Sequence, residues 1–329
     1  MYRFCGIITD KKKGFMYKNL VIAVAVPAYN EERLIEKTLS TIPNYVDHIV
    51  VVNDASKDDT FKKIQSYKKR DDRIFLINNK VNGGIGYSLK KAIRKGVELG
   101  ADKVAVMAGD AQMDPNQLQN LLSEMEIKNL DFIKANRFLH LDELKSMPFY
   151  RRLGNVIVTI LTKFATGYYS IFDTQNGYVV YSKDIIERMQ WGMVGNRYEF
   201  ENTVLIALSI ANAKISDYPI PAHYGEEKST IKLFSTTLRV LKVLFKGFWQ
   251  RIYYKYVLYN FHPIALFLFG GLLLTSLGFI IGAWVLAEKT LNMVSPTSGT
   301  VMLIVLPLIL GIQMLLTALI LDVTEDSKN

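Results

Sequence analysis

Up to Tyr224 the chain alternates short β-branched runs with charged amphipathic segments, and this alternation limits the possible folds more than any other feature. The expected strands are Val21–Pro27, His48–Asn53, Arg73–Asn78 and Lys103–Ala108, and the expected helices are Glu31–Ile42, Asp58–Lys69, Tyr87–Leu99 and Pro115–Glu126. Strand–helix alternation at this spacing predicts an α/β domain with a mostly parallel sheet and helices on both faces.

Polar residues follow each of these four strands. They are Pro27–Glu32, Asn53–Ser56, Asn82–Gly84 and Gly109–Gln112. Sheets of this kind bind ligands at the carboxyl ends of their strands. We therefore expect the four segments to converge on one site.

The rest of the soluble region continues the pattern. We expect a helix over Phe149–Ala165, a strand over 178–182, a helix over Tyr198–Asn212 and a strand over Lys214–Pro219. A further helix, Ile231–Ile252, carries apolar residues on one face and cations on another. This pattern is typical of a helix in the membrane interface, and the alternative is an ordinary core helix.

Two apolar stretches, Pro263–Leu286 and Val301–Leu321, are each long enough to cross a bilayer as a helix. The region from Lys228 to Phe261 holds seven Lys or Arg residues and no acid, so much of the +9 net charge lies next to the first stretch. A basic run in this position is typical of attachment to a membrane and argues against nucleic-acid binding. By the positive-inside rule, this basic run is expected on the cytoplasmic side of the membrane. The sequence therefore predicts an integral membrane protein with its catalytic domain and both termini in the cytoplasm.

The lone Cys5 excludes an intramolecular disulfide and fits a reducing compartment, and no secretory signal pattern opens the chain. The expected organisation is an extension (1–19), a soluble domain (20–230), juxtamembrane amphipathic helices (231–262), two transmembrane helices (263–286 and 301–321) and a tail (322–329). Whether the chain forms a homo-oligomer stays open.

The segment VAVPAYNEERLIEKTL, followed by HIVVVNDASKDDT, resembles the opening of the family 2 glycosyltransferases. The resemblance implies a GT-A, Rossmann-like nucleotide-sugar domain in which Pro27, Tyr29, Glu31 and Asp54 contact the donor. The alternative is that Asn30 and Asp54 only cap helices. The turn Asn82-Gly83-Gly84-Ile85-Gly86 meets neither the dinucleotide nor the P-loop pattern. Its likeness to the family's N-x-G-x-G turn implies that Gly84 lies beside the donor.

The segment AVMAGDAQMDP resembles the family's D-x-D-x-Q metal motif, with Asp110 at the second acid and Gln112 at the Gln. The resemblance implies Mg²⁺ or Mn²⁺ bound by these two residues, with Asp110 also catalytic. The first acid of the motif falls on Ala108, so we expect weaker metal binding or more dependence on substrate phosphates.

Later segments resemble the polyprenyl-phosphate branch of the family, of the dolichol-phosphate mannose synthase type. The resemblance implies acceptor-phosphate contacts at Arg137, Arg151, Arg152 and Asn155, with solvated basic surface as the alternative for the arginines. Phe172–Tyr178 is similar to the branch's D-x-x-(S/N)-G-(F/Y) element, which implies a catalytic or orienting carboxylate at Asp173. His223–Ser229 is similar to the closing R-x-x-G-E-S-K loop, which implies a donor contact at Lys228.

Together these features predict a membrane-bound inverting glycosyltransferase. It would move a single sugar from a nucleotide diphosphate sugar to a polyprenyl phosphate of the dolichyl or undecaprenyl type, in cell-envelope glycan biosynthesis. One alternative is a polysaccharide or glycolipid synthase of the same fold, although two spans make a poor channel. Another is a catalytically impaired membrane scaffold, which Ala108 would permit.

Overall fold

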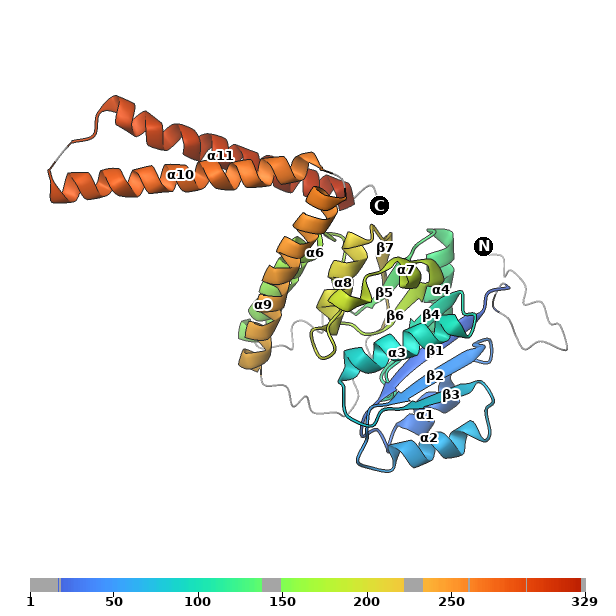
Figure 1. Ribbon diagram of the computed structural model, residues 1–329. Helices are drawn as coiled ribbons and strands as arrows, with labels where there is room; N and C mark the ends of the chain where they lie inside the picture. Colours follow the sequence, from blue (N-terminus) through green and yellow to red (C-terminus); the bar gives the residue numbers. More distant parts are fainter. Residues whose placement is uncertain are drawn as a thin grey trace. The chain divides into compact units, whose positions relative to one another are not determined.

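The computed structural model describes residue 17 and residues 19–137, 149–221, 233–259, 261–293 and 295–326, with the backbone alone for 149–155 and 233–239. The chain divides into two compact units (Figure 1). The first unit comprises Met1–Thr166 and Ser170–Phe248, and the second comprises Gly167–Tyr169 and Trp249–Asn329.

The first unit is built on a seven-stranded sheet of order β3-β2-β1-β4-β6-β5-β7. The strands are β1 (Ile22–Ala28), β2 (His48–Asn53), β3 (Ile74–Asn78), β4 (Lys103–Val106), β5 (Phe132–Asn136), β6 (Val179–Ser182) and β7 (Ile215–Pro219). Strand β6 is antiparallel to both β4 and β5, and the other neighbours are parallel. The predicted mostly parallel sheet is therefore confirmed. Because β1 pairs with β2 on one side and β4 on the other, the sheet has its topological switch point between β1 and β4.

Helices cover both faces of the sheet (Figure 1). The described helices of the first unit are α1 (Ile35–Thr41), α2 (Thr60–Lys68), α3 (Ile85–Glu98), α4 (Gln117–Ile127), α6 (Phe149–Thr166), α7 (Lys183–Arg188), the 3₁₀ turn η1 (Trp191–Met193) and α8 (Phe200–Ile210). Helix α9 (Leu233–Arg251) begins in the first unit and continues into the second at Trp249. Alternate residues of β1, such as Val24 and Val26, form one apolar core with Leu39 of α1 and Leu121 of α4. This follows from the period of two along a strand.

The other face of β1 and β4 lies under α3, and a small residue permits the close approach. A Cβ built on Gly96 would lie 3.1 Å from the Cβ of Ala23 and 3.2 Å from Val104 Cγ2. Because both faces of β1 are covered, all seven of its residues are buried. This explains why its sequence is apolar throughout.

The element boundaries differ from the expected ones mainly at α1 and α7. Helix α1 begins at Ile35, four residues later than expected, because the amide of Glu31 donates to Thr60 Oγ1 (2.8 Å) and fixes a turn there. Helix α7, which the sequence reading did not foresee, begins after Ser182, whose Oγ accepts from the amide of Ile185.

The expected interfacial helix corresponds to α9. Its Leu244 is buried, and a Cβ built on Gly247 would lie 2.1 Å from Ile206 Cδ1 of α8. Phe245 between them is exposed. This part of α9 therefore packs against α8 of the first unit and leaves the side chain of Phe245 exposed.

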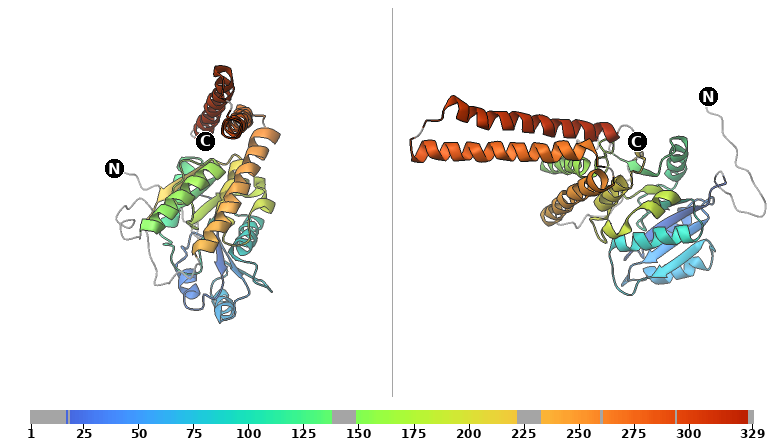
Figure 2. Two further views of the ribbon diagram at one scale, coloured as in Figure 1. Left: turned by 90° about the vertical axis from the view of Figure 1, so that its left-hand side faces the viewer. Right: turned by 45° about the horizontal axis from the view of Figure 1, so that its top comes forward.

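The second unit holds two long antiparallel helices, α10 (Pro263–Leu291) and α11 (Ser298–Asp326) (Figures 1 and 2). Both are long and apolar enough to cross a membrane, by length and composition. Glycines permit their close packing: a Cβ on Gly271 would lie 3.0 Å from Gly311 O, and one on Gly278 would lie 2.6 Å from Leu308 Cγ. Most of their large apolar side chains face outward.

A buried polar cluster lies at the end of α11. Arg251, wholly buried, precedes the π-helix η2 (Ile252–Leu258) and pairs with both carboxylate oxygens of Asp322 (2.7 and 2.9 Å). The hydroxyls of Tyr256 (2.6 Å) and Tyr169 (2.9 Å) also donate to Asp322. The buried charges are thus paired and hydrogen-bonded, which buried ions require.

Candidate functional site

A cleft of about 530 Å³ opens where the first four strands end. We call it the first cleft, and its lining is Pro27, Ala28, Tyr29, Glu31, Asp54, Asn82, Gly84, Ile85, Ser88, Ala108, Gly109, Asp110, Arg197 and Tyr198. All four polar segments that follow the strands contribute to it, so their predicted convergence is confirmed. The cleft lies at the switch point between β1 and β4, where ligands of such sheets bind.

Asp54 organises the glycine turn at one wall of the first cleft. Its carboxylate accepts hydrogen bonds from the amides of Gly83 (3.0 Å) and Gly84 (2.8 Å) and from Asn79 Nδ2 (2.8 Å). Gly84 has φ +92°, a conformation that favours glycine. Asp54, which was predicted to contact the donor, therefore also fixes the Gly83–Gly84 turn. This is the turn beside which the donor was expected to lie.

The β1–α1 loop is locked to the β2–α2 loop. The amide of Asn30 donates to Ser56 Oγ (3.0 Å), and Asn30 Oδ1 accepts from the amide of Lys57 (2.9 Å). Neither Asn30 nor Asp54 caps a helix, since α1 and α2 begin after Leu34 and Asp59. The capping alternative was wrong because these polar groups bond between loops.

Tyr29 and Glu31, in the same loop, line the first cleft together with Pro27. The Tyr29 residue is 42% exposed. A half-exposed aromatic face at the rim of a cleft is suited to stacking against a planar group.

Asp110 stands at the junction of the first cleft with a second cleft of about 380 Å³. Burial raises the pKa of its carboxyl, and a hydrogen bond from the amide of Gln112 (3.1 Å) offsets this in part. Gln112 also lines the second cleft. Within the described ranges no three His, Cys, Asp or Glu side chains gather in a metal-binding group. One carboxylate with one amide can hold Mg²⁺ when substrate phosphates complete the shell.

Ala108 stands where the family motif has its first acid. Its amide donates to Met113 Sδ (3.3 Å), and Met113 lines the second cleft. An apolar thioether therefore occupies space beside the position of the absent carboxylate.

The second cleft is lined by Ile85, Asp110, Gln112, Met113, Asp114, Arg137, Gln175, Asn176, Gly177, Tyr178, Arg197, Tyr198, Phe200, Glu201, Ile220 and Pro221. Arg137 follows β5, and its side chain is held by Asp173. Asp173 Oδ2 accepts from Arg137 Nε (2.8 Å) and from its amide (3.2 Å), while Oδ1 accepts from Nη2 (3.2 Å). Asp173 is wholly buried and lines neither cleft, whereas Arg137 is 36% exposed and lines the second.

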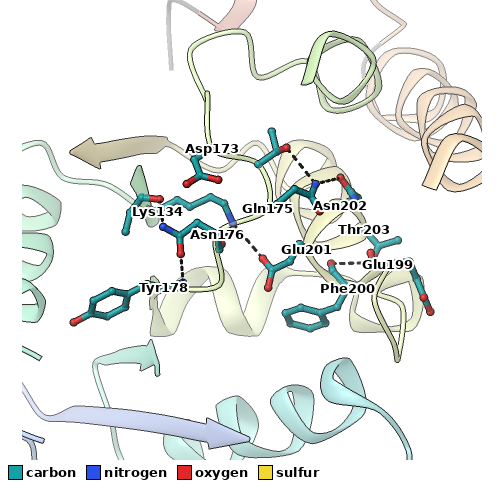
Figure 3. Close-up of polar contacts among 12 residues, drawn as sticks. Lys134, Asp173, Gln175, Asn176, Tyr178, Glu199, Phe200, Glu201, Asn202 and Thr203 are labelled. Atoms are coloured by element: carbon teal, nitrogen blue, oxygen red, sulfur yellow. Dashed lines mark hydrogen bonds and ion pairs between the residues drawn. The ribbon is translucent and has the colours of Figure 1, made fainter. Parts of the chain in front are cut away.

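Figure 3 shows a second ion pair, between Lys134 and Glu201. Lys134, buried on β5, contacts Glu201 Oε2 (3.2 Å) and donates to the carbonyl of Asn176. Burial raises the pKa of Glu201, and the charge of Lys134 opposes the rise. Only Glu201 of this pair lines the cleft. Its position in the first turn of α8 was visible in the sequence, but its partner, 67 residues earlier, was not.

Arg197 and Tyr198 line both clefts, and sequence reasoning gave neither a role. No motif marks them. Their loop reaches the site because the amide of Tyr87, in α3, donates to the carbonyl of Asn196 (3.0 Å).

Four predicted site residues cannot be placed by their side chains. Lys228 lies outside the described residues, and Arg151, Arg152 and Asn155 lie in α6 where the backbone alone is described.

Comparison with known proteins gives a consistent result. A family model described as Glycosyl transferase family 2 matches residues 23–190. The chain is 26% identical over 219 residues to the UDP-N-acetylglucosamine–dolichyl-phosphate N-acetylglucosaminyltransferase of Methanococcus voltae, covering 63% of this chain and 87% of the relative. It is 23% identical over 231 residues to the dodecaprenyl-phosphate galacturonate synthase of Rhizobium johnstonii, covering 68% of this chain and 65% of the relative.

Among solved structures, glucosyl-3-phosphoglycerate synthase of Mycobacterium tuberculosis, crystallised with Mn²⁺, UDP and glucosyl-3-phosphoglycerate, has a TM-score of 0.55. The identity is 16%, and the match covers 70% of this chain and 80% of that one. At this identity the likeness concerns the fold, and it confirms the predicted GT-A architecture.

Proposed function

We propose that this chain, which belongs to glycosyl transferase family 2 and is a glycosyltransferase, transfers a single sugar from a nucleoside diphosphate sugar to a polyprenyl phosphate. The observation that carries the proposal is the junction of two clefts at Asp110. One cleft has the position of a nucleotide site, and the other presents Arg137, a cation suited to a phosphate. The two relatives described above are named for a dolichyl phosphate and for a dodecaprenyl-phosphate galacturonate.

The donor would occupy the first cleft. Tyr29 would stack on the base beside Pro27, with Glu31 and Asp54 at the base or ribose and Gly84 at the phosphates. Lys228 is retained as a donor contact from the sequence resemblance alone. Asp54 would act both directly and through the Gly83–Gly84 turn that it holds.

Asp110 and Gln112 would hold the divalent cation. Bound Mg²⁺ or Mn²⁺ would supply positive charge to the departing diphosphate. With Ala108 in place of a second carboxylate, more of the coordination shell would come from the donor itself. We therefore expect metal and nucleotide to bind together rather than independently.

The acceptor phosphate would meet Arg137 in the second cleft. A phosphate oxygen would attack the anomeric carbon from the side opposite the diphosphate, which inverts the configuration. Because this oxygen is already ionised near neutral pH, the step needs no strong general base. Asp173, buried behind Arg137, would then serve to orient the guanidinium. Arg151, Arg152 and Asn155 are proposed as further acceptor contacts from the sequence.

A lipid acceptor is also supported by exposed apolar surface. On α6, which begins with the proposed acceptor arginines, one face is exposed and apolar; it consists of Val156, Ile157, Ile160, Leu161 and Phe164. With α10 and α11 as membrane helices, the basic residues before Pro263 favour cytoplasmic placement of the first unit and both termini.

The test is transfer of label from nucleotide sugars into lipid. Membranes containing the chain are incubated with radiolabelled nucleotide sugars, polyprenyl phosphate and Mg²⁺ or Mn²⁺, and the organic phase is counted. We expect metal-dependent label that Asp110→Asn abolishes. Label in a polymer that stays out of the organic phase would favour a polysaccharide synthase, and no transfer from any donor would favour a scaffold.

A further inference from the structure

We propose that Arg197 binds the diphosphate of the donor and stabilises the negative charge that develops on it as it leaves. This inference rests on the proposed function, because it assigns a residue to the same reaction. Arg197 precedes α8 and lies outside the sequence motifs quoted above for the resemblance.

The first argument is position. Four residues line both clefts: Ile85, Asp110, Arg197 and Tyr198. In the proposed reaction, the bond that forms and the bond that breaks meet at this junction. Arg197 therefore lines the same junction as Asp110, the carboxylate that would hold the metal.

The second argument is charge. Among the described residues that line the first cleft, the acids are Glu31, Asp54 and Asp110, and the one cation is Arg197. The Asp54 carboxylate already accepts three hydrogen bonds from the protein. A diphosphate brought into such a cleft needs positive charge beyond that of a metal held by Asp110 and Gln112, and a guanidinium fork matches phosphate oxygens.

The third argument is that hydrogen bonds fix the backbone around Arg197, while its guanidinium stays available. The amide of Gly195 donates to Thr203 Oγ1 (2.9 Å), and Lys90 Nζ donates to the carbonyl of Val194 (2.8 Å). The amide of Arg197 donates to Glu199 Oε1 (3.2 Å). In the part of the chain that the structure describes, the Arg197 guanidinium itself makes no ion pair or hydrogen bond, so it is available to a ligand.

The stem of Arg197 also lies over the glycine turn. A Cβ built on Gly84 would lie 2.8 Å from Arg197 Cγ and 2.6 Å from the carbonyl oxygen of Asn196. The amides of Gly83 and Gly84 in this turn donate to the carboxylate of Asp54. The guanidinium is thereby anchored next to the turn at which the donor phosphates are expected.

The chemistry follows directly. As the acceptor oxygen forms its bond to the anomeric carbon, the bond from that carbon to the diphosphate oxygen breaks, and its electron pair stays on the diphosphate. The diphosphate gains one unit of negative charge, so a cation beside it binds the transition state more tightly than the ground state. Loss of one such group typically lowers kcat by about 100- to 1,000-fold.

The test compares Arg197→Met and Arg197→Lys with Arg70→Met in the purified full-length chain. Arg70 is an exposed arginine of the same unit that lines neither cleft, so its variant makes the same charge change elsewhere. Binding of UDP, GDP, CDP and ADP and of the four parent nucleosides is measured with Mg²⁺, together with kcat and KM for both substrates.

We expect Arg197→Met to weaken the preferred nucleoside diphosphate at least tenfold, to leave its nucleoside unchanged, and to lower kcat about 100- to 1,000-fold. Arg197→Lys should recover part of kcat, and Arg70→Met should match the wild type. If Arg197→Met weakened the binding of nucleoside and nucleoside diphosphate equally, or changed only the KM for the acceptor, the inference would be overturned. Transfer by the wild type would still leave the proposed function standing. A wild type that binds none of these nucleotides and transfers no sugar would overturn both.

Discussion

The pairing of Asp173 with Arg137 permits a test that separates an orienting carboxylate from a general base. In Asp173→Asn the side chain keeps its size but loses its charge, and an amide cannot accept all three hydrogen bonds that the carboxylate accepts from Arg137. Arg137 is 36% exposed, so solvent screens part of the loss.

Hydrogen bonds to charged groups are worth about 1.5–3 kcal/mol, which at ~1.4 kcal/mol per tenfold corresponds to about 10- to 150-fold. We expect this loss chiefly in the KM for the lipid phosphate, because Arg137 would bind the acceptor. The donor KM should change little.

The assay is steady-state transfer with each substrate varied in turn, for Asp173→Asn, Arg137→Met and the double variant. Because both residues act as one unit, the double variant should be no worse than Arg137→Met alone. Asp217→Asn is the matched control, since Asp217 accepts from Asn136 Nδ2 and the amide of Phe172 in the same region without contacting Arg137. A kcat lowered about 10⁴-fold at unchanged acceptor KM, with loss of a limb of the pH profile, would refute the orienting role and indicate a base.

Three further predictions concern the metal, the anchor and the buried acid. Ala108→Asp should lower the Mg²⁺ concentration for half-maximal activity roughly tenfold, because a second carboxylate raises the ligand charge; no change in a metal titration would place the cation elsewhere. Asp322→Asn should cost about 3–5 kcal/mol in the free energy of unfolding measured in detergent, because it leaves the buried Arg251 without its counter-charge, and Arg251→Met with Asp322→Leu should recover most of it. Since burial raises the pKa of Glu201 above its ordinary 4.5, the folded state holds this proton more tightly, so its contribution to stability is present below pH 4.5 and is lost as the pH rises through the raised pKa. The measurement is the free energy of unfolding by denaturant at a series of pH values. Glu201→Gln should remove the fall of this free energy with rising pH, whereas an unchanged fall would assign it to another group.

The sheet and the first cleft were accessible from the sequence because each rests on local patterns. The apolar run of β1 indicates that the strand is buried on both faces. The polar residues after β1 and β4 indicate where these strands end, and the ends of neighbouring parallel strands meet at one edge of the sheet. The Ala108 departure was equally visible, since it occurs inside a short motif.

Contacts between residues that are distant in the sequence could not be predicted from such local patterns. Asp54 bonds Gly84, 30 residues away, and Arg197 packs over the same glycine from more than a hundred residues further along. Lys134 gives no sign in its strand that it pairs with Glu201. These contacts join segments that are distant in the sequence, and no local pattern records which distant segment lies beside which.

The most direct measurement of the central claim is the mass of the lipid product. The purified chain, a nucleotide sugar that supports transfer, Mg²⁺ and a polyprenyl phosphate of known length are incubated, and the lipid is analysed by mass spectrometry. The account predicts a lipid phosphate heavier by one sugar residue, formed by the wild type and not by Asp110→Asn. A lipid carrying several sugars, or a sugar added to a diphosphate rather than to the monophosphate, would contradict it.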